Sequence, residues 1–147
     1  MEKEIDIDRG KIVTYNTWTG FIASILLIPF GIGLPLLVIH VILVAVFYQR
    51  QAEAIRYYYD SRALRVERGL LFKSRKTIPF DKITDLELVQ GPLLRALGMW
   101  NIKVQTASTA SQMPEATLMG VVNPEQVREE ILVAKDEYLK AHGAVGR

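Results

Sequence analysis

The chain has 147 residues, half of them apolar, and a formal net charge of +2 at neutral pH. It contains no cysteine, which excludes disulfides, thiolate catalysis and zinc–cysteine sites. The modest charge argues against a nucleic-acid partner, because domains of that class carry a pronounced basic surface. About a quarter of the chain lies in one apolar stretch, and what remains is enough for one small domain.

Residues 12–49 contain no Asp, Glu, Lys or Arg. As a single helix these residues would reach about 57 Å, against a hydrocarbon core of roughly 30 Å. The segment from Pro29 to Pro35 contains two prolines and two glycines, which disfavour continued helix. The stretch therefore predicts a transmembrane helical hairpin over residues 11–52, with spans at about Lys11–Pro29 and Leu34–Gln49.

Basic residues lie on both sides of this stretch and are absent from its central turn. Lys3, Arg9 and Lys11 precede it, and eight Lys or Arg occur between residues 49 and 76. Because Lys and Arg accumulate on the cytoplasmic side of a span, we expect a multi-pass protein of the cytoplasmic (inner) membrane with both termini cytoplasmic. Residues 1–10 would then be a cytoplasmic tail. The alternative is one kinked span, about Phe21–Tyr48, with the N-terminus on the opposite face.

Alternating apolar and polar residues follow the hairpin and predict six or seven short strands. The runs lie at residues 54–60, 64–67, 76–80, 83–90, 102–106 and 116–122. Pro79 predicts an edge strand or a bend. Asn123 and Pro124 are typical of a helix start, and apolar residues then recur at helical spacing over about 124–141. The sequence predicts a mainly-β sandwich or barrel over 53–140, closed by this helix, and a flexible tail at 142–147.

One sequence motif narrows the choice among mainly-β folds. Gln90-Gly91-Pro92-Leu93-Leu94-Arg95 is followed by Ile102-Lys103-Val104-Gln105-Thr106-Ala107 and Met113-Pro114. In this order, behind a hairpin of two spans, these segments resemble the bacterial pleckstrin-homology-like (PH-like) membrane-flanked domain family, its YdbS-like members in particular.

The resemblance implies a cytoplasmic PH-like domain on a membrane anchor, with no catalytic residues and no cofactor to carry over. It implies a non-enzymatic scaffold that acts with a related membrane protein carrying further PH-like units, or by self-association. Some relatives are linked to resistance against antimicrobial peptides, which makes envelope protection the expected process. The motif is expected to be structural, with Gly91 and Pro92 turning the chain and Leu93, Leu94 and Leu97 filling the core.

The best candidate for a binding surface is a group of basic residues just after the hairpin: Arg62, Arg65, Arg68, Lys73, Arg75 and Lys76. Each Lys or Arg near an anionic leaflet is worth about 1 kcal/mol, so this group predicts an alternative role as a sensor or binder of anionic lipid head groups. The other interpretation is a solvated sheet face that reflects only the positive-inside bias. No clear motif for phosphoinositide binding is present.

The remaining polar residues do not indicate a catalytic or metal-binding site. His40 and Asn16 lie in the predicted spans, where a hydrogen bond between helices and a functional role are both open. The hydroxyls of Thr106–Ser111 have no neighbouring base for nucleophilic catalysis. The two histidines lie far apart in the sequence, so no metal site is expected.

Overall fold

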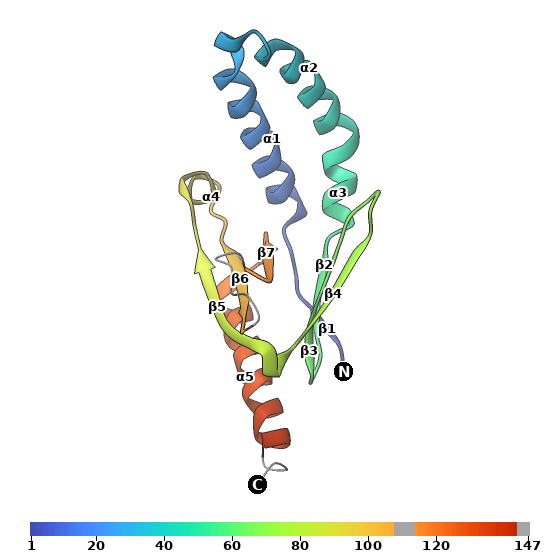
Figure 1. The fold of residues 1–147 in the computed structure, drawn as a ribbon, viewed down its shortest axis with the longest axis vertical. Helices are drawn as coiled ribbons and strands as arrows, with labels where there is room; N and C mark the ends of the chain where they lie inside the picture. Colours follow the sequence, from blue (N-terminus) through green and yellow to red (C-terminus); the bar gives the residue numbers. More distant parts are fainter. Residues whose placement is uncertain (108–113, 144–147) are drawn as a thin grey trace.

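The computed structural model describes residues 1–107 and 114–143. Two helical arms form a hairpin at one end of the molecule, two β-sheets make up the middle, and a long helix points toward the other end (Figure 1). The mainly-β domain and its C-terminal helix are confirmed.

The first arm of the helical hairpin is α1 (Arg9–Leu26), whose N-terminus is capped by the Asp8 carboxylate accepting from the Lys11 N–H at 3.0 Å. The second arm is a continuous helix composed of α2 (Gly33–Leu43), the π-helical η2 (Val44–Tyr48) and α3 (Gln49–Glu53). The chain reverses through the short 3-10 helix η1 (Ile28–Phe30) and Gly31, whose φ of 77° favours glycine.

The two arms pack side by side rather than forming one bent helix, which is the geometry of the predicted hairpin. The second arm reaches Glu53, beyond the predicted end at Gln49. Pro35 lies in the first turn of α2, within the predicted second span, where its missing N–H breaks no intrahelical hydrogen bond. At Gly33 the arms meet so closely that a Cβ would lie 2.3 Å from the Ile28 nitrogen.

Among the described residues, seven strands form two antiparallel sheets. The first sheet has the order β1-β2-β3-β4, with β1 (Lys3–Glu4), β2 (Arg56–Tyr59), β3 (Ala63–Arg68) and β4 (Ser74–Pro79). The second has the order β5-β6-β7, with β5 (Ile83–Val89), β6 (Asn101–Thr106) and β7 (Ala116–Met119). Pro79 ends the edge strand β4, as predicted, because an edge position does not need its N–H.

The main core lies between the sheets. The register pairs Tyr57 with Val66 and Leu64 with Ile78, which places these four side chains on the inner face of the first sheet. Ile102, Val104 and other alternate residues of the second sheet face them. Strands β6 and β7 bury every second residue, as the alternation predicts, whereas β4 buries only Ile78.

The N-terminal residues belong to this core, which corrects the prediction of a tail over residues 1–10. Ile5 and Ile7 are 4% and 6% exposed. The Ile5 N–H donates to the Tyr57 carbonyl at the edge of the first sheet, and Ile7 forms a bridge with Val121 just after β7. The segment therefore joins the two sheets along one side.

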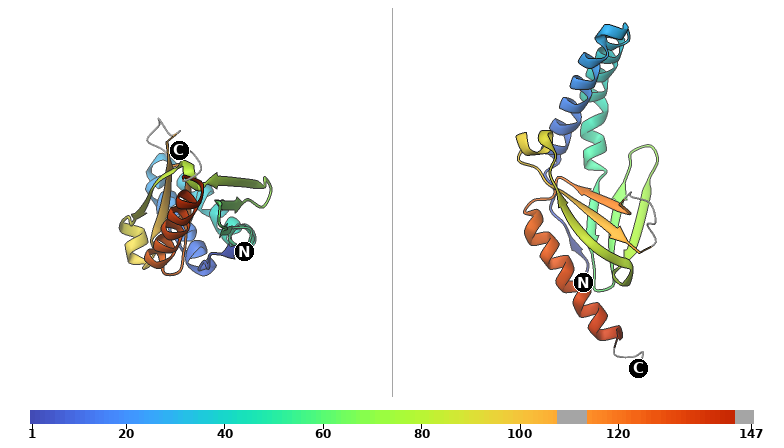
Figure 2. Two further views of the ribbon diagram at one scale, coloured as in Figure 1. Left: turned by 90° about the horizontal axis from the view of Figure 1, so that it is seen from below. Right: turned by 60° about the vertical axis from the view of Figure 1, so that its left-hand side comes forward.

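Three helical elements complete the domain: η3 (Phe80–Lys82), α4 (Pro92–Ala96) and α5 (Pro124–Gly143). Seen from below, α5 lies across the domain between the two sheets (Figure 2). It buries Ile131 in the main core and places Tyr138 against Phe80, with ring centroids 6.3 Å apart. The predicted apolar stripe of this helix is the face that covers the sheets.

Candidate membrane-facing site

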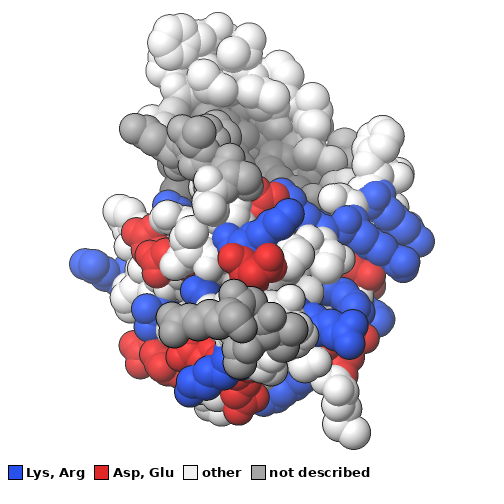
Figure 3. Space-filling model, turned by 60° about the horizontal axis from the view of Figure 1, so that its bottom comes forward, with Lys and Arg blue, Asp and Glu red and all other residues white. Residues whose placement is uncertain are grey.

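The helical hairpin exposes a large apolar surface. Between Phe21 and Val46 many large side chains are more than a third exposed, among them Phe30 at 76% and Val38 at 60%. The helical hairpin shows no charged side chain at the top of Figure 3. Contiguous exposed apolar surface of this extent indicates a membrane or protein contact rather than contact with water.

Length and composition distinguish the two arms. Within the part of the chain that the structure describes, one helix, Gly33–Glu53, is long and apolar enough to cross a membrane. The more polar α1 begins with Arg9 and Lys11 and includes Asn16. A span formed by α1 therefore stays a prediction.

A second core joins the base of the helical hairpin to the β domain. It consists of Ile12 from α1, Ala52 from α3, and Leu94 and Met99 from the α4 region, all 5% exposed or less. Lys11 adds a polar contact, donating from Nζ to the Gly98 carbonyl at 3.4 Å. The helical hairpin is thus packed on the domain rather than tethered by a linker.

The Gln90–Arg95 motif supplies this contact. Gly91 precedes α4 and Pro92 begins it, as expected, and Leu94 is buried against the helical hairpin, while Leu97 is half-buried beside it. Gln90 Nε2 donates to the Met99 carbonyl at 3.0 Å, which closes the loop around α4. The motif therefore fills the core between the helical hairpin and the domain.

His40 links the two arms. Its Nε2 donates to the Thr17 carbonyl at 2.9 Å, and Nδ1 accepts from the Tyr48 hydroxyl at 3.2 Å. Since a carbonyl only accepts, this pattern is that of the Nε2–H tautomer. Gly20 makes room for the ring, because a Cβ there would lie 2.1 Å from His40 Cε1. The side chain serves as a hydrogen bond between helices, one of the two roles left open by the sequence.

The π-helical segment η2 brings Tyr48 to His40. In an α-helix, residues seven apart lie on nearly the same side, because two turns take about 7.2 residues. His40 and Tyr48 are eight apart, and the wider turn of η2 takes up the extra residue.

The structure does not gather the six basic candidates into one patch. Arg62 and Arg65 lie near the β2–β3 turn, whereas Arg68, Lys73 and Arg75 lie at the opposite end, near the β3–β4 turn. The two faces of the sheet also separate them, because Arg65 and Arg75 are on the outer face and Arg68 and Lys76 are on the inner one.

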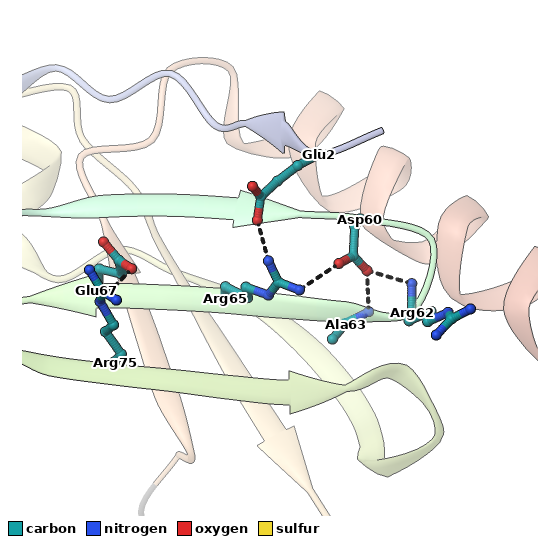
Figure 4. Close-up of polar contacts among 7 residues, drawn as sticks. All are labelled: Glu2, Asp60, Arg62, Ala63, Arg65, Glu67 and Arg75. Carbon is teal, nitrogen blue, oxygen red and sulfur yellow. Dashed lines mark hydrogen bonds and ion pairs between the residues drawn. The ribbon is translucent and has the colours of Figure 1, made fainter.

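Several of these cations are neutralised by carboxylates. On the outer face Arg65 contacts Glu2 and lies 3.0 Å from Asp60, and Arg75 lies 2.9 Å from Glu67 (Figure 4). Asp60 also accepts from the backbone N–H groups of Arg62 and Ala63. Burial alone would raise the pKa of Asp60, but these backbone donors and Arg65 lower it overall. The charged groups at this end of the sheet therefore stabilise the β2–β3 turn.

Lys76 also has an acidic partner, since it contacts both the carboxylate and the carbonyl of Glu115. Arg68 differs from Arg65, Arg75 and Lys76. Its guanidinium lies 5.8 Å from the Tyr57 ring centroid, and its buried Nε and Nη2 have no hydrogen-bond partner among the described residues.

Arg68 lines a cavity of about 260 Å³ between the end of α3 and the β3–β4 turn. The cavity is also lined by the cations Arg56, Lys73 and Arg75 and by the carboxylates Glu53 and Glu67: the site carries both signs of charge.

No pattern in the sequence pointed to a polar cluster that surrounds Glu130. Its carboxylate accepts from Lys3 at 2.7 Å, Tyr59 at 2.9 Å and Gln126 at 3.0 Å. The hydrogen bond from Lys3 has the largest effect on this carboxylate. Together with the hydrogen bonds from Gln126 and Tyr59, it lowers the pKa of Glu130 to about 2. Glu130 lies on α5, one position from Ile131, and no local sequence pattern links it to the N-terminus.

Within the described residues no group of three or more His, Asp or Glu could hold a metal ion. Most of the Thr106–Ser111 segment, and Met113, lie outside the described residues.

A family model for the bacterial PH domain matches residues 14–135, from within α1 to within α5. The chain therefore belongs to the bacterial PH domain family, which confirms the resemblance. The match includes most of the helical hairpin as well as the β domain. No curated protein and no solved structure gives a significant match. Membership of this family indicates a non-enzymatic scaffold or binding role.

Proposed function

We propose that this protein is a non-enzymatic scaffold of the prokaryotic cytoplasmic membrane, anchored by both arms of the helical hairpin. The observation that carries the proposal is the exposed apolar surface of the hairpin, together with the second core that packs its base on the PH-like domain. A domain attached in this way stays close to the bilayer in one orientation.

The composition of α1 is compatible with a span. Its 18 residues cover about 27 Å, close to the thickness of the hydrocarbon core. Its hydroxyls donate to carbonyls one turn earlier, as in the bonds from Thr14 to Gly10 and from Ser24 to Gly20. Side chains satisfied within their own helix cost less in lipid than unpaired ones.

The charge distribution supports a topology with both termini in the cytoplasm. Arg9 and Lys11 lie at the base of α1, and Arg50 lies at the base of the second arm. The turn at Phe30 is the farthest point from these cations along both arms and would reach the outer face.

The absence of native cysteine makes this topology testable. We expect Phe30→Cys to react with a membrane-impermeant maleimide on spheroplasts, whereas Ser61→Cys and a cysteine fused before Met1 react only after lysis. Labelling of the N-terminal cysteine from outside would favour the single kinked span. Recovery of the protein in the soluble fraction would overturn the proposal.

Protein–protein contact is the proposed mode of action. The expected partner is a membrane protein with further PH-like units, or a second copy of the chain, and envelope protection against antimicrobial peptides is the proposed process. Copurification in mild detergent, with cross-linking and mass spectrometry, tests this. A strictly monomeric protein that copurifies with nothing contradicts it.

Binding of anionic lipid head groups is the second candidate. It is favoured by the cavity between α3 and the β3–β4 turn, where Arg56, Arg68 and Lys73 lie close to the base of the anchor. The Arg62–Arg65 end is a poor candidate, since Arg65 is paired with Glu2 and Asp60.

A further inference from the structure

Three consecutive apolar side chains lie at the end of the β3–β4 hairpin. Leu70 is 36%, Leu71 76% and Phe72 90% exposed. Gly69 allows this tight turn with a φ of 103°, and a Cβ there would lie 1.9 Å from the Phe72 carbonyl oxygen. The turn thus presents three apolar side chains to the surroundings, which is unfavourable in water.

Cations flank this tip, which we define as Leu70–Phe72. Arg68 precedes it by two residues and Lys73 follows it directly. Both line the cavity that reaches Glu53 and Ala54 at the base of the helical hairpin. Figure 3 shows Lys and Arg gathered at the right edge of the molecule, beside an uncharged projection.

The tip lies where the helical hairpin would leave the lipid. It points in the same direction as the helical hairpin and reaches the level of α3 in Figure 1, and the right-hand view of Figure 2 agrees. The helix that is apolar enough to cross a membrane ends at Glu53, which lines the same cavity as Gly69. A bilayer crossed by the helical hairpin would therefore meet the tip at its head-group region.

We infer that Leu70–Phe72 inserts into the interface of the bilayer that holds the helical hairpin, while Lys73 and Arg75 contact anionic head groups. The Arg75 side chain is paired with Glu67 but stays 78% exposed. Apolar side chains with a basic rim suit such a surface, because the acyl boundary takes the former and lipid phosphates attract the latter. The domain then has a third contact with the membrane, which fixes its tilt. This inference rests on the proposed membrane anchoring.

The test uses the full chain, reconstituted in vesicles of phosphatidylcholine and phosphatidylglycerol, with one cysteine carrying an environment-sensitive fluorophore. Phe72→Cys reports on the tip, Ser61→Cys on the opposite turn of the same sheet, and Val38→Cys on α2. We expect nitroxide-labelled lipids to quench the labels at positions 72 and 38, and a water-soluble quencher to reach position 61.

Each outcome decides between the proposals. If position 72 behaves like position 61 while position 38 is quenched by lipid, the inference is wrong and the anchoring stands. If position 38 is open to water, the anchoring fails as well. Protection of position 72 from both quenchers would mean that the tip is covered by another protein copy, which also overturns the inference.

Vesicles of phosphatidylcholine alone test the basic rim. We expect lipid quenching at position 72 to fall at least twofold in them, and to fall similarly in anionic vesicles with Lys73→Gln and Arg75→Gln. Arg62→Gln with Lys82→Gln removes the same charge away from the tip and is expected to leave the quenching unchanged. Equal quenching in both lipids, or equal effects of the two pairs, would refute the head-group contact.

Discussion

Glu130 connects three segments that are far apart in the sequence, because its carboxylate binds Lys3 from β1, Tyr59 from β2 and Gln126 from α5. These donors favour the ionised form and lower the pKa of Glu130 to about 2. The same contact raises the pKa of Lys3. A lowered carboxyl pKa stabilises the fold above the ordinary value near 4.5, and this contribution is lost as the pH falls toward 2.

We expect Glu130→Gln to lower the melting temperature by about 3 °C at neutral pH, since the ion pair is partly exposed and modest in energy. The difference from the wild type should shrink as the pH falls from 4.5 toward 2. Thermal unfolding in detergent across this range measures it. A difference that does not change with pH would mean that Glu130 acts through packing rather than charge.

Gly20 is the residue on which the contact between the two arms depends, because the His40 ring occupies the place of a Cβ. Gly20→Ala should separate the arms and destabilise the helical hairpin by about 1–3 kcal/mol, the usual cost of overpacking. Gly10→Ala is the matched control in the same helix, where the nearest atom to a Cβ is Asp8 Oδ1 at 3.4 Å. Equal unfolding curves for the two variants in detergent would contradict this account of His40.

At the scale of elements, α4 joins the helical hairpin to the β domain. Leu94→Ala should remove packing against Ile12 and Ala52 and cost about 2–4 kcal/mol, as for other large-to-small substitutions in a core. The distance distribution between spin labels at Val38 and Ser61 should broaden, because the helical hairpin would no longer be fixed on the domain. Leu93→Ala, at a half-buried neighbour outside this core, is the control and should leave the distribution narrow. A narrow distribution in Leu94→Ala would disprove the second core as the rigid joint.

The six basic candidate residues form a cluster in the sequence, but the geometry of the strands separates them in space. Arg65, Arg68, Arg75 and Lys76 are close in the sequence, yet alternation along β3 and β4 divides them between the two faces of the sheet. The β2–β3 and β3–β4 turns also lie at opposite ends of the sheet. Counting charges along the sequence therefore identified the strands that carry the basic residues. It did not show which of these residues share one surface. The sequence did not identify the tip at Leu71 and Phe72, because a short apolar run is normally interpreted as part of a core. Only the structure shows that these side chains are exposed.

At the scale of the whole molecule, the N-terminal segment holds the two sheets together. Ile5 and Ile7 are buried, and the intervening Asp6 is exposed. Replacing both isoleucines with serine should cost more than about 4 kcal/mol, because each loses a buried aliphatic side chain. Glu4→Ser with Asp6→Ser, on the opposite face, should unfold at nearly the wild-type temperature. Similar melting temperatures for the two double variants would show that residues 1–10 are the tail predicted from the sequence.

The proposed anchor and the domain form one body in this arrangement. The second core fixes the base of the helical hairpin, the N-terminal segment ties α1 to both sheets, and the β3–β4 tip points along the helical hairpin. A scaffold built in this way presents α5 and the far end of both sheets to partners away from the bilayer.

The sequence by itself determined the order of elements: a helical hairpin, short alternating strands and a C-terminal helix. These features follow from local rules, because apolar length, two-residue periodicity and the Asn123–Pro124 start act over a few neighbouring residues. The tertiary structure alone decided which distant residues meet, such as Ile12 with Leu94, Thr17 with His40 and Lys3 with Glu130. Such contacts depend on how packed elements are oriented, and no periodicity within one segment carries that information.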